Sequence, residues 1–419
     1  MLRLALTHPI APWCAAFSVL ALLPFLFPSN GSIIILNQMG ITVIFALSYN
    51  VLLGQTGLLS FGHSVFMGIG GFACIHVLKS VASGDWDIPL PLLPILSGLF
   101  SATIAAIIGS FQTRRSGTTF AMISLGIVEL TASLAIIIGA FFGMGGMSAD
   151  RTLAPAVFGA NFAQQSQVYW IVAGWVLFSL AALYGLTQTP LGRMANAVRD
   201  NPDRAEYLGY STTRIRFSSF LIAGFFAGVA GGLSAITFEI ASAENLTLEA
   251  SGTILLVTFI GGTGFFLGPV LGAILFTLLQ TVLSFETDLW QLYLGILFLA
   301  CVMFFPDGLA GLIARHRVLL RSNRIKQLIA PYALFGGTAL LALFSTVSLI
   351  EMIFFLRTAG PEDTSLTLFW TDLDPSTPTP WITALALLGL SFYALARTLP
   401  KFRAAWEQAQ SPPKTPPLP

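Results

Sequence analysis

Charged residues and cysteines are both scarce in this chain of 419 residues. Only 9% of the residues are charged, whereas a typical soluble domain has about 25%, and 55% are hydrophobic. So little charge excludes an ordinary soluble globular protein and indicates an integral membrane protein. The three cysteines, Cys14, Cys74 and Cys301, all fall within apolar runs, so no disulfide framework is indicated.

Motifs of catalysis and nucleotide binding are also missing. The sequence has no phosphate-binding Gly-x-x-x-x-Gly-Lys-Ser/Thr loop, no His-Glu-x-x-His and no nucleophile elbow. His63 and His76 do not have the spacing of a helical metal pair, so packing or capping explains them better than ligation. We therefore expect this chain to be no enzyme and to bind no metal or cofactor itself. Nucleic-acid binding has no support either.

Long apolar runs predict an all-α fold, a polytopic bundle of membrane helices. A helix needs about 20 apolar residues to span a bilayer. The predicted bundle has about ten core segments, including a broken or re-entrant pair in 251–284, and two extra C-terminal helices. The candidate spans are 12–28, 33–53, 61–79, 90–111, 118–142, 168–187, 217–238, the broken stretch 251–284, 289–305, 329–355 and 381–399.

Basic residues sort to one side of this bundle. With the N-terminus in the cytoplasm and 251–284 crossing twice, only Lys79, Arg151 and Arg357 of the 20 basic residues lie outside. This is the bias that the positive-inside rule requires, and a single crossing at 251–284 would reverse it for 315–326. We therefore expect about twelve crossings and two cytoplasmic termini.

One hydrophilic loop, residues 189–216, carries five arginines between two apolar runs. Pro190 suits the first turn of a helix. Asn201 can cap a second short helix that starts at Pro202, and Gly209 can end it in a left-handed conformation. The first helix would have one apolar face, made by Leu191, Met194, Ala195 and Val198. The loop is either a solvated segment that orients the protein by charge or a docking surface for a soluble partner.

Glycine and proline interrupt the apolar runs at two places. The first break lies within residues 54–64. The second break contains Gly261, Gly262, Gly264, Gly268 and Pro269. Irregular backbone is not tolerated in lipid, so each break must be buried, line a polar cavity or lie at an interface. Paired interrupted helices are typical of transport pathways, although close packing of glycine-rich helices explains each break separately.

Polar side chains within apolar runs mark a candidate solute pathway. The most costly is Glu129, because an acid at a helix centre costs roughly 2.5–3.5 kcal/mol in a membrane. It should face a cavity or a partner; the alternative is a hydrogen-bonded helix contact. We place six residues near the pathway: Asn50, Gln55, Ser60, His63, Ser64 and Glu129.

Four segments resemble, in order and spacing, the permeases of ABC importers for branched-chain amino acids. They are the glycine-rich segment 50–70, a Gly-Arg…Ala-x-Arg-x-Asn…Ala-x-x-x-Gly pattern in the loop, Gly-Gly-x-Gly…Gly-Pro within 261–272, and Phe305-Pro-Asp-Gly-Leu309. The match covers roughly residues 33–312 and favours the longer of the two permeases. The resemblance assigns ATPase coupling to loop residues Gly192, Arg193, Arg199, Asn201, Ala205, Glu206, Leu208 and Gly209.

The resemblance also implies partners and a location. The partners are a second homologous permease, two cytoplasmic ATPase subunits that bind ATP and magnesium, and a periplasmic or surface solute-binding protein. The location is the bacterial cytoplasmic (inner) membrane, in contact with lipid. Because the wider family also carries urea, amides and other small organic compounds, the solute stays open. The alternative function is a self-contained secondary carrier or membrane enzyme that uses Glu129 and the histidines His63 and His76.

The resemblance ends near residue 313, which suggests the following organisation. Residues 1–32 form an N-terminal membrane helix, 33–313 the permease core with its loop 189–216, and 314–328 a basic linker. Residues 329–400 form an extra hairpin, and 401–419 a disordered Pro-rich tail. The hairpin has neither a central charge nor a Gly/Pro break, so we expect it to be peripheral. A subunit contact and a lid are the alternatives.

Overall fold

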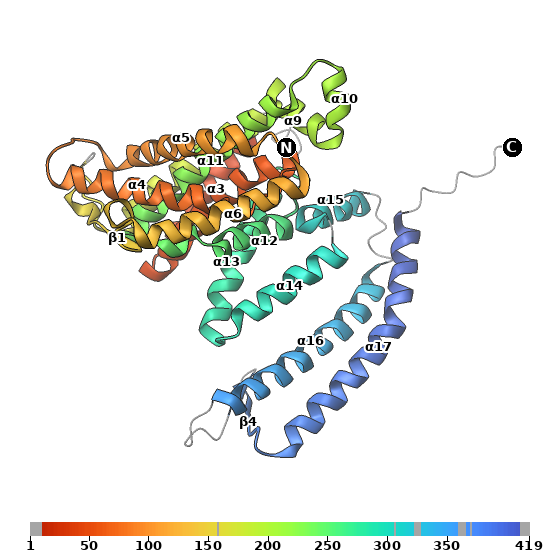
Figure 1. The fold of residues 1–419 in the computed structure, drawn as a ribbon. Coiled ribbons are helices and arrows are strands. Elements are labelled where there is room, and N and C mark those ends of the chain that lie inside the picture. Colours follow the sequence, from red (N-terminus) through yellow and green to blue (C-terminus); the bar gives the residue numbers. More distant parts are fainter. Residues whose placement is uncertain are drawn as a thin grey trace. The chain divides into compact units, whose positions relative to one another are not determined.

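The computed structural model of the protein describes residues 11–156, 159–305, 307–321, 328–358, 366–368 and 371–410. Most of these residues are helical (Figure 1). The helices are α2 (Ala11–Leu26), α3 (Asn30–Asn50), α4 (Ser64–Ala82), α5 (Leu93–Gln112), α6 (Gly117–Ile137), α7 (Gly139–Phe142), α8 (Gln165–Gln188), α9 (Pro190–Asp200), α10 (Pro202–Tyr207), α11 (Thr212–Phe238), α12 (Leu248–Gly261), α13 (Gly268–Glu286), α14 (Trp290–Phe304), α15 (Gly308–Arg321), α16 (Ile329–Thr358) and α17 (Pro378–Gln410).

The remaining elements are short. A π-helix, η1 (Val51–Gln55), continues α3, and three 3-10 helices are η2 (Leu90–Leu92), η3 (Arg151–Leu153) and η4 (Ala243–Leu246). Two antiparallel strand pairs occur, β1 (Gly146–Ser148) with β2 (Ile240–Ser242) and β3 (Leu366–Leu368) with β4 (Thr371–Leu373). The first pair joins the loop after α7 to the end of α11.

The described residues contain nine helices long and apolar enough to cross a membrane, and a tenth crossing if the broken pair α14 and α15 counts as one. The predicted all-α polytopic bundle is therefore confirmed. Two predicted spans are shorter than expected, since the apolar helices Trp13–Leu26 and Leu248–Gly261 fall below the length of a full crossing. The predicted span 118–142 ends at Ile137.

The chain divides after Leu312 into two units, and the sequence placed its boundary at 313. In the first unit α11 is the central helix, since it packs against α3, α4 and α5 and 78% of its most apolar stretch is buried. Small residues allow the close crossings: a Cβ on Gly231 would lie 1.8 Å from the carbonyl oxygen of Met67. The Ser101 hydroxyl of α5 lies 2.9 Å from the carbonyl oxygens of Phe66 in α4 and Gly224 in α11, and so joins these three helices.

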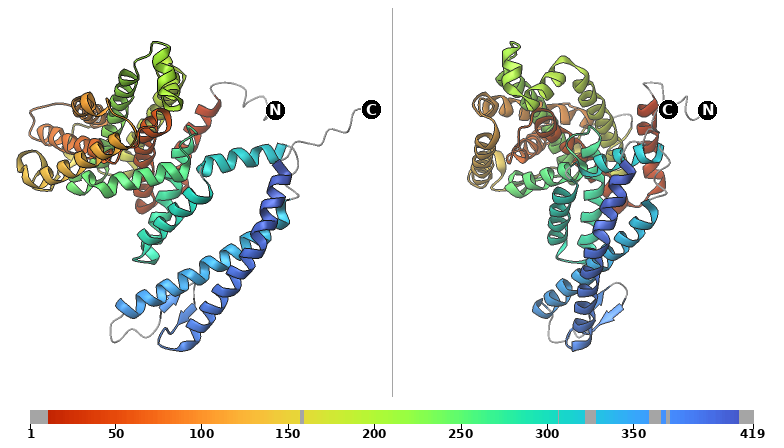
Figure 2. Two further views of the ribbon diagram at one scale, coloured as in Figure 1. Left: turned by 45° about the vertical axis from the view of Figure 1, so that its right-hand side comes forward. Right: turned by 90° about the vertical axis from the view of Figure 1, so that its right-hand side faces the viewer.

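In the second unit α16 and α17 lie side by side (Figure 2). Their pairing is antiparallel, because Phe335 of α16 stacks on Phe402 of α17, Tyr332 meets the same ring edge to face, and Thr338 faces Thr398. Helix α17 continues to Gln410, so the predicted tail boundary at 401 is wrong by ten residues. The reason is that the rings of this extension pack on α16, which outweighs the proline at position 400.

The structure describes only part of the predicted linker and of the predicted chain ends. The basic linker 314–328 is helical as far as Arg321, where α15 ends. Its residues 322–327 lie outside the described part, as do residues 1–10 of the first predicted helix and residues 411–419 of the predicted tail.

Candidate functional site

The hydrophilic loop is folded into two capped helices, α9 and α10, at one end of α8 and α11 (Figure 1). The side-chain oxygens of Thr189, Asn201 and Ser211 each accept a hydrogen bond from the backbone N–H three residues later, and so cap α9, α10 and α11. Gly209, with φ of +87°, follows α10 in the left-handed region. The predicted helix starts, the Asn201 cap and the left-handed glycine are confirmed.

One side of this loop is buried against the bundle. Ala195, Val198, Ala205 and Ile215 form a buried cluster, with Leu191 and Met194 packed on it. Gly192 allows α9 to approach α8, because a Cβ there would lie 2.3 Å from the carbonyl oxygen of Leu186. The Thr212 hydroxyl donates to Glu206 at 2.6 Å, which ties α10 to α11. The loop is therefore a folded platform that is capped and packed on one side.

The other side of the loop presents large apolar groups. Tyr207, the last residue of α10, is 91% exposed, and Leu208 and Tyr210, which follow the helix, are 70% and 45% exposed. Among these, the sequence prediction contained Leu208 and missed both tyrosines. Their proximity to Gly209 was visible in the sequence, but their exposure depends on the turn that this glycine makes. Together the three residues form an apolar knob on a hydrophilic loop.

The first break is a helix end held by Gly57. Gly57 has φ of +69°, its N–H donates to the carbonyl of Leu53, and the N–H of Leu58 donates to that of Leu52. These two bonds, from Gly57 to the residue four positions earlier and from Leu58 to the residue six positions earlier, close a left-handed helix end that stops the π-helix η1. The backbone then runs without helix to Ser64, where α4 begins.

The candidate pathway residues of this break are all buried inside the first unit: Asn50, Gln55, Ser60, His63 and Ser64. His63 is fully enclosed; its Nε2 is 2.9 Å from the Ser48 hydroxyl, and its ring stacks on Phe45. The Tyr49 hydroxyl donates to the carbonyl of Ser60 at 3.0 Å. The side-chain oxygen of Asn50 and the Nδ1 of His63 have no hydrogen-bond partner among the described residues.

Both ends of the break 54–64 contact the region of α12. The N–H of Ser64 donates to the Ser251 hydroxyl at 3.0 Å, near the start of α12. At the other end, a Cβ on Gly54 would lie 2.6 Å from the carbonyl oxygen of Thr263, just beyond the end of α12. From Ser251 to the end of α12 at Gly261 the helix rises by about 15 Å, at 1.5 Å per residue. The irregular backbone is thus aligned along α12, within the protein.

The second break separates α12 from α13 at a close crossing. A Cβ on Gly261 would lie 2.0 Å from the carbonyl oxygen of Gly268, and Gly262 has φ of +104°. Pro269 occupies the first turn of α13. A Cβ on Gly264 would meet nothing within 4 Å, so this predicted glycine has no steric role here. Gly308, at φ of +63°, packs on Gly262 and was not among the predicted residues.

Glu129 lies apart from the other candidate pathway residues. It is exposed on α6, whereas His63 is enclosed, so this chain does not bring the two together as a carrier site would require. The same helix contacts the first break on its buried side, where the N–H of Phe61 donates to the Ser124 hydroxyl at 2.8 Å. His76 bonds to the carbonyl of Phe141 at 2.8 Å, a packing role.

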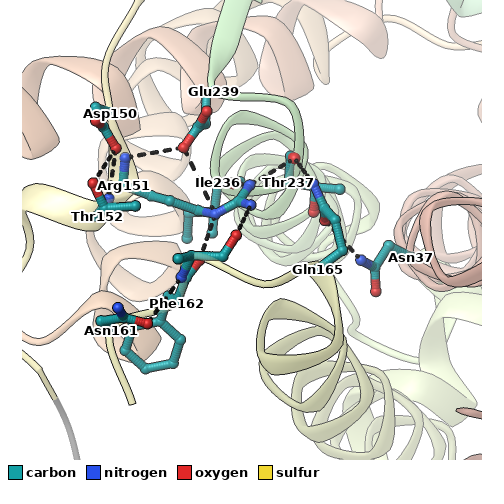
Figure 3. A network of polar contacts seen from close by, with 11 residues as sticks. Asn37, Asp150, Arg151, Thr152, Asn161, Phe162, Gln165, Ile236, Thr237 and Glu239 are labelled. Atoms are coloured by element: carbon teal, nitrogen blue, oxygen red, sulfur yellow. Dashed lines mark hydrogen bonds and ion pairs between the residues drawn. The ribbon is translucent and has the colours of Figure 1, made fainter. Parts of the chain in front are cut away.

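Arg151 joins the loop before α8 to the end of α11 (Figure 3). Its guanidinium donates to the carbonyls of Phe162, Ile236 and Thr237 at 2.7–3.1 Å and lies 3.7 Å from the Glu239 carboxylate. Gln165 bonds to the same Thr237 carbonyl and to Asn37 of α3. A helix end leaves carbonyls without partners, and Arg151 satisfies them. Its burial explains a basic residue on the side that the sequence assigns to the exterior.

Arg151→Ala is expected to lower the melting temperature of the detergent-purified protein by several degrees. The substitution leaves buried carbonyls unsatisfied, and each costs about 1–3 kcal/mol. Lys79→Ala, at an exposed basic residue of α4, is the matched control and should change little. A melting temperature that is the same for both variants would show that the Arg151 contacts contribute nothing to stability.

Comparison with known proteins places the chain in a family. Residues 32–302 match the model of the permease component of branched-chain amino acid transport systems. The chain is 28% identical to the high-affinity branched-chain amino acid transport system permease protein LivM of Salmonella typhimurium, over 72% of this chain and 75% of that protein. The LivM of Escherichia coli shows the same identity and coverage.

More distant relatives have other names. The autoinducer 2 import system permease protein LsrC of Klebsiella pneumoniae is 31% identical over 36% of this chain and 47% of its own length. The fructose import permease protein FrcC of Rhizobium meliloti is 24% identical over 54% of this chain and 67% of its own length. No solved structure matches. Because the family model covers well over half of the sequence, the chain belongs to the family of permease components of branched-chain amino acid transport systems.

Proposed function

We propose that this chain is the membrane-spanning subunit of an ATP-driven importer and that it receives its ATPase at the α9–α10 loop. The observation that carries the proposal is the apolar knob of Tyr207, Leu208 and Tyr210 on a folded, capped platform. Monomeric proteins rarely expose such groups together outside a binding surface. Aromatic residues that project from a rigid support are typical anchors of protein interfaces.

The other subunits of the importer follow from this assignment. A second, homologous permease completes the translocation pathway, two cytoplasmic ATPase subunits bind ATP and magnesium, and a solute-binding protein docks on the opposite face. The chain then lies in the bacterial inner membrane with the α9–α10 loop and both termini in the cytoplasm. The basic residues of this loop, Arg193, Arg199, Arg204, Arg214 and Arg216, support that orientation.

The solute is a branched-chain amino acid or a related small organic compound. The names of the LivM relatives support an amino acid, and their match covers most of both chains. The LsrC and FrcC matches are shorter and carry names of different solutes. The test is to purify the chain with its natural partners, reconstitute the complex in liposomes and compare ATP-dependent uptake of leucine with that of fructose. Uptake without any copurified ATPase would contradict the proposal.

Tyr207→Ser combined with Leu208→Ser should reduce the amount of ATPase that copurifies with the chain by about tenfold or more, since anchor residues each contribute about 2 kcal/mol or more. Both side chains are exposed, so membrane insertion should be unaffected. Trp86→Ser, at a half-exposed residue in the loop after α4, provides the control. An unchanged ATPase yield would mean that the knob is not the docking surface.

A further inference from the structure

Arg199 of the α9–α10 loop contacts the backbone of the first break. A guanidinium nitrogen of Arg199, in the last turn of α9, donates to the carbonyl of Gly54 in η1. Gly54 is also the point where the first break approaches the second, because a Cβ there would lie 2.6 Å from the Thr263 carbonyl oxygen. The loop and the two breaks therefore meet at one backbone position.

The Gly54 carbonyl needs such a partner because of the way the helix ends. In a continuing α-helix it would accept from the N–H of Leu58, but that N–H donates to Leu52 instead. The left-handed turn at Gly57 thus leaves the Gly54 carbonyl without the Leu58 donor that a continuing helix would supply. Arg199 supplies the donor, and the backbone passes close to its stem, since a Cβ on Gly57 would lie 2.9 Å from Cγ of Arg199.

Arg199 has a second partner on its own helix. Its Nε and second guanidinium nitrogen are both 3.0 Å from one carboxylate oxygen of Asp200, and its side chain is 37% exposed. If α9 moved away from η1, the ion pair with Asp200 would move with it. Only the bond to Gly54 would break, so the charge would keep a partner in both arrangements.

We infer that Arg199 is the positioning residue that transmits displacement of the α9–α10 loop to the paired breaks. With the bond to Gly54 formed, η1 and the segment up to Ser64 are held along α12. Displacement of α9 removes the donor and frees η1 to rearrange, and π-helices are frequent at such functional positions. This inference rests on the proposed function, because it takes the ATPase to act on the α9–α10 loop.

The test uses the complete transporter in liposomes and measures solute imported per ATP hydrolysed. Arg199→Ala should lower this ratio by about tenfold or more, the effect of one charge-assisted hydrogen bond, without reducing ATPase copurification. Arg199→Lys retains a donor and should restore part of the ratio. Arg214→Ala removes an equal charge at the exposed first turn of α11 and should leave the ratio near that of the wild type.

A paired-cysteine variant tests the same contact in a second way. A Cβ built on Gly57 would lie 3.7 Å from the Cβ of Arg199, within the range of a disulfide. With both replaced by cysteine, oxidation should suppress ATP hydrolysis and reduction should restore hydrolysis without import. In either single-cysteine variant, oxidation should leave the rate of ATP hydrolysis unchanged.

The outcomes separate this inference from the proposed function. A wild-type complex that contains no ATPase would overturn both. A wild-type complex with coupled import, together with an Arg199→Ala variant of unchanged ratio, would overturn the Arg199 inference alone. Undiminished hydrolysis and import in the oxidised double-cysteine complex would do the same, because separation of α9 from η1 would then be unnecessary.

Discussion

Gly261→Ala is expected to abolish import and to reduce the amount of folded protein in the membrane. The added Cβ would lie 2.0 Å from the carbonyl oxygen of Gly268 and 3.0 Å from the N of Gly272, both backbone atoms of α13. Backbone in a packed crossing cannot rotate away as a side chain can. The cost should therefore exceed the ~1–3 kcal/mol typical of an overfilled core.

The control for this variant lies on the same helix. A Cβ on Gly252 would meet nothing within 4 Å, so Gly252→Ala should be tolerated and should even favour the helix by up to about 1 kcal/mol. Uptake and the yield of monodisperse protein in detergent are the two measurements. If both alanine variants behaved like the wild type, the close approach of α12 to α13 would not be needed for the fold.

The helix caps of the α9–α10 loop were predictable because the residues that mark them lie close to the backbone groups they bind. Thr189, Asn201 and Gly209 act on backbone groups within four residues, so the sequence window that contains them also contains their effect. The apolar face of α9 follows in the same way from helical spacing. These features are therefore determined by residues close in sequence and depend little on tertiary contacts.

Contacts between distant segments were not predictable in this way. The Arg199–Gly54 bond joins residues 145 positions apart. The sequence around either residue contains no pattern that points to the other. From its sequence, Arg151 is only one basic residue on the outer side. Its actual partners are backbone carbonyls, which every residue possesses, so no sequence pattern could identify them.

The end of α17 shows how packing can override a local signal. From its Pro-rich composition, the sequence placed residues 401–419 in a disordered tail, after a helix that ends before Pro400. The helix continues past it because Phe402 and Trp406 stack on each other and on the aromatic face of α16. Their spacing of one helical turn was visible, but it required a partner surface whose position the sequence does not reveal.

Glu129 is exposed on α6, and its sequence spacing alone does not reveal what its face of the helix meets. The most apolar stretch of α6 is only 28% buried, against 78% for α11. On the face of α6 that is exposed in this chain, Glu129 follows Met122 and Gly126 and precedes Ser133 at helical spacing. A lipid environment would cost the charged carboxylate roughly 2.5–3.5 kcal/mol. Under the proposed function, this face is the one that would meet the second permease, with the solute pathway between the two chains.

Glu129→Leu is expected to reduce amino-acid uptake by about tenfold or more while the protein accumulates in the membrane at least as well as the wild type. The carboxylate is complementary to the ammonium group of an amino acid, and loss of a hydrogen bond to a charged group costs about 1.5–3 kcal/mol. Removal of a charge from an apolar helix can only assist insertion. Initial uptake rates and the quantity of inserted chain measure the two effects separately.

The neighbouring residue provides the control for Glu129. Leu130 is 60% exposed on the adjacent side of α6, so Leu130→Ala should affect uptake little. Uptake at the wild-type rate by Glu129→Leu, combined with higher protein yield, would show that the acid faces lipid or a purely structural contact. Loss of uptake in Glu129→Leu alone, with the ATPase still bound, would place the solute within reach of this carboxylate.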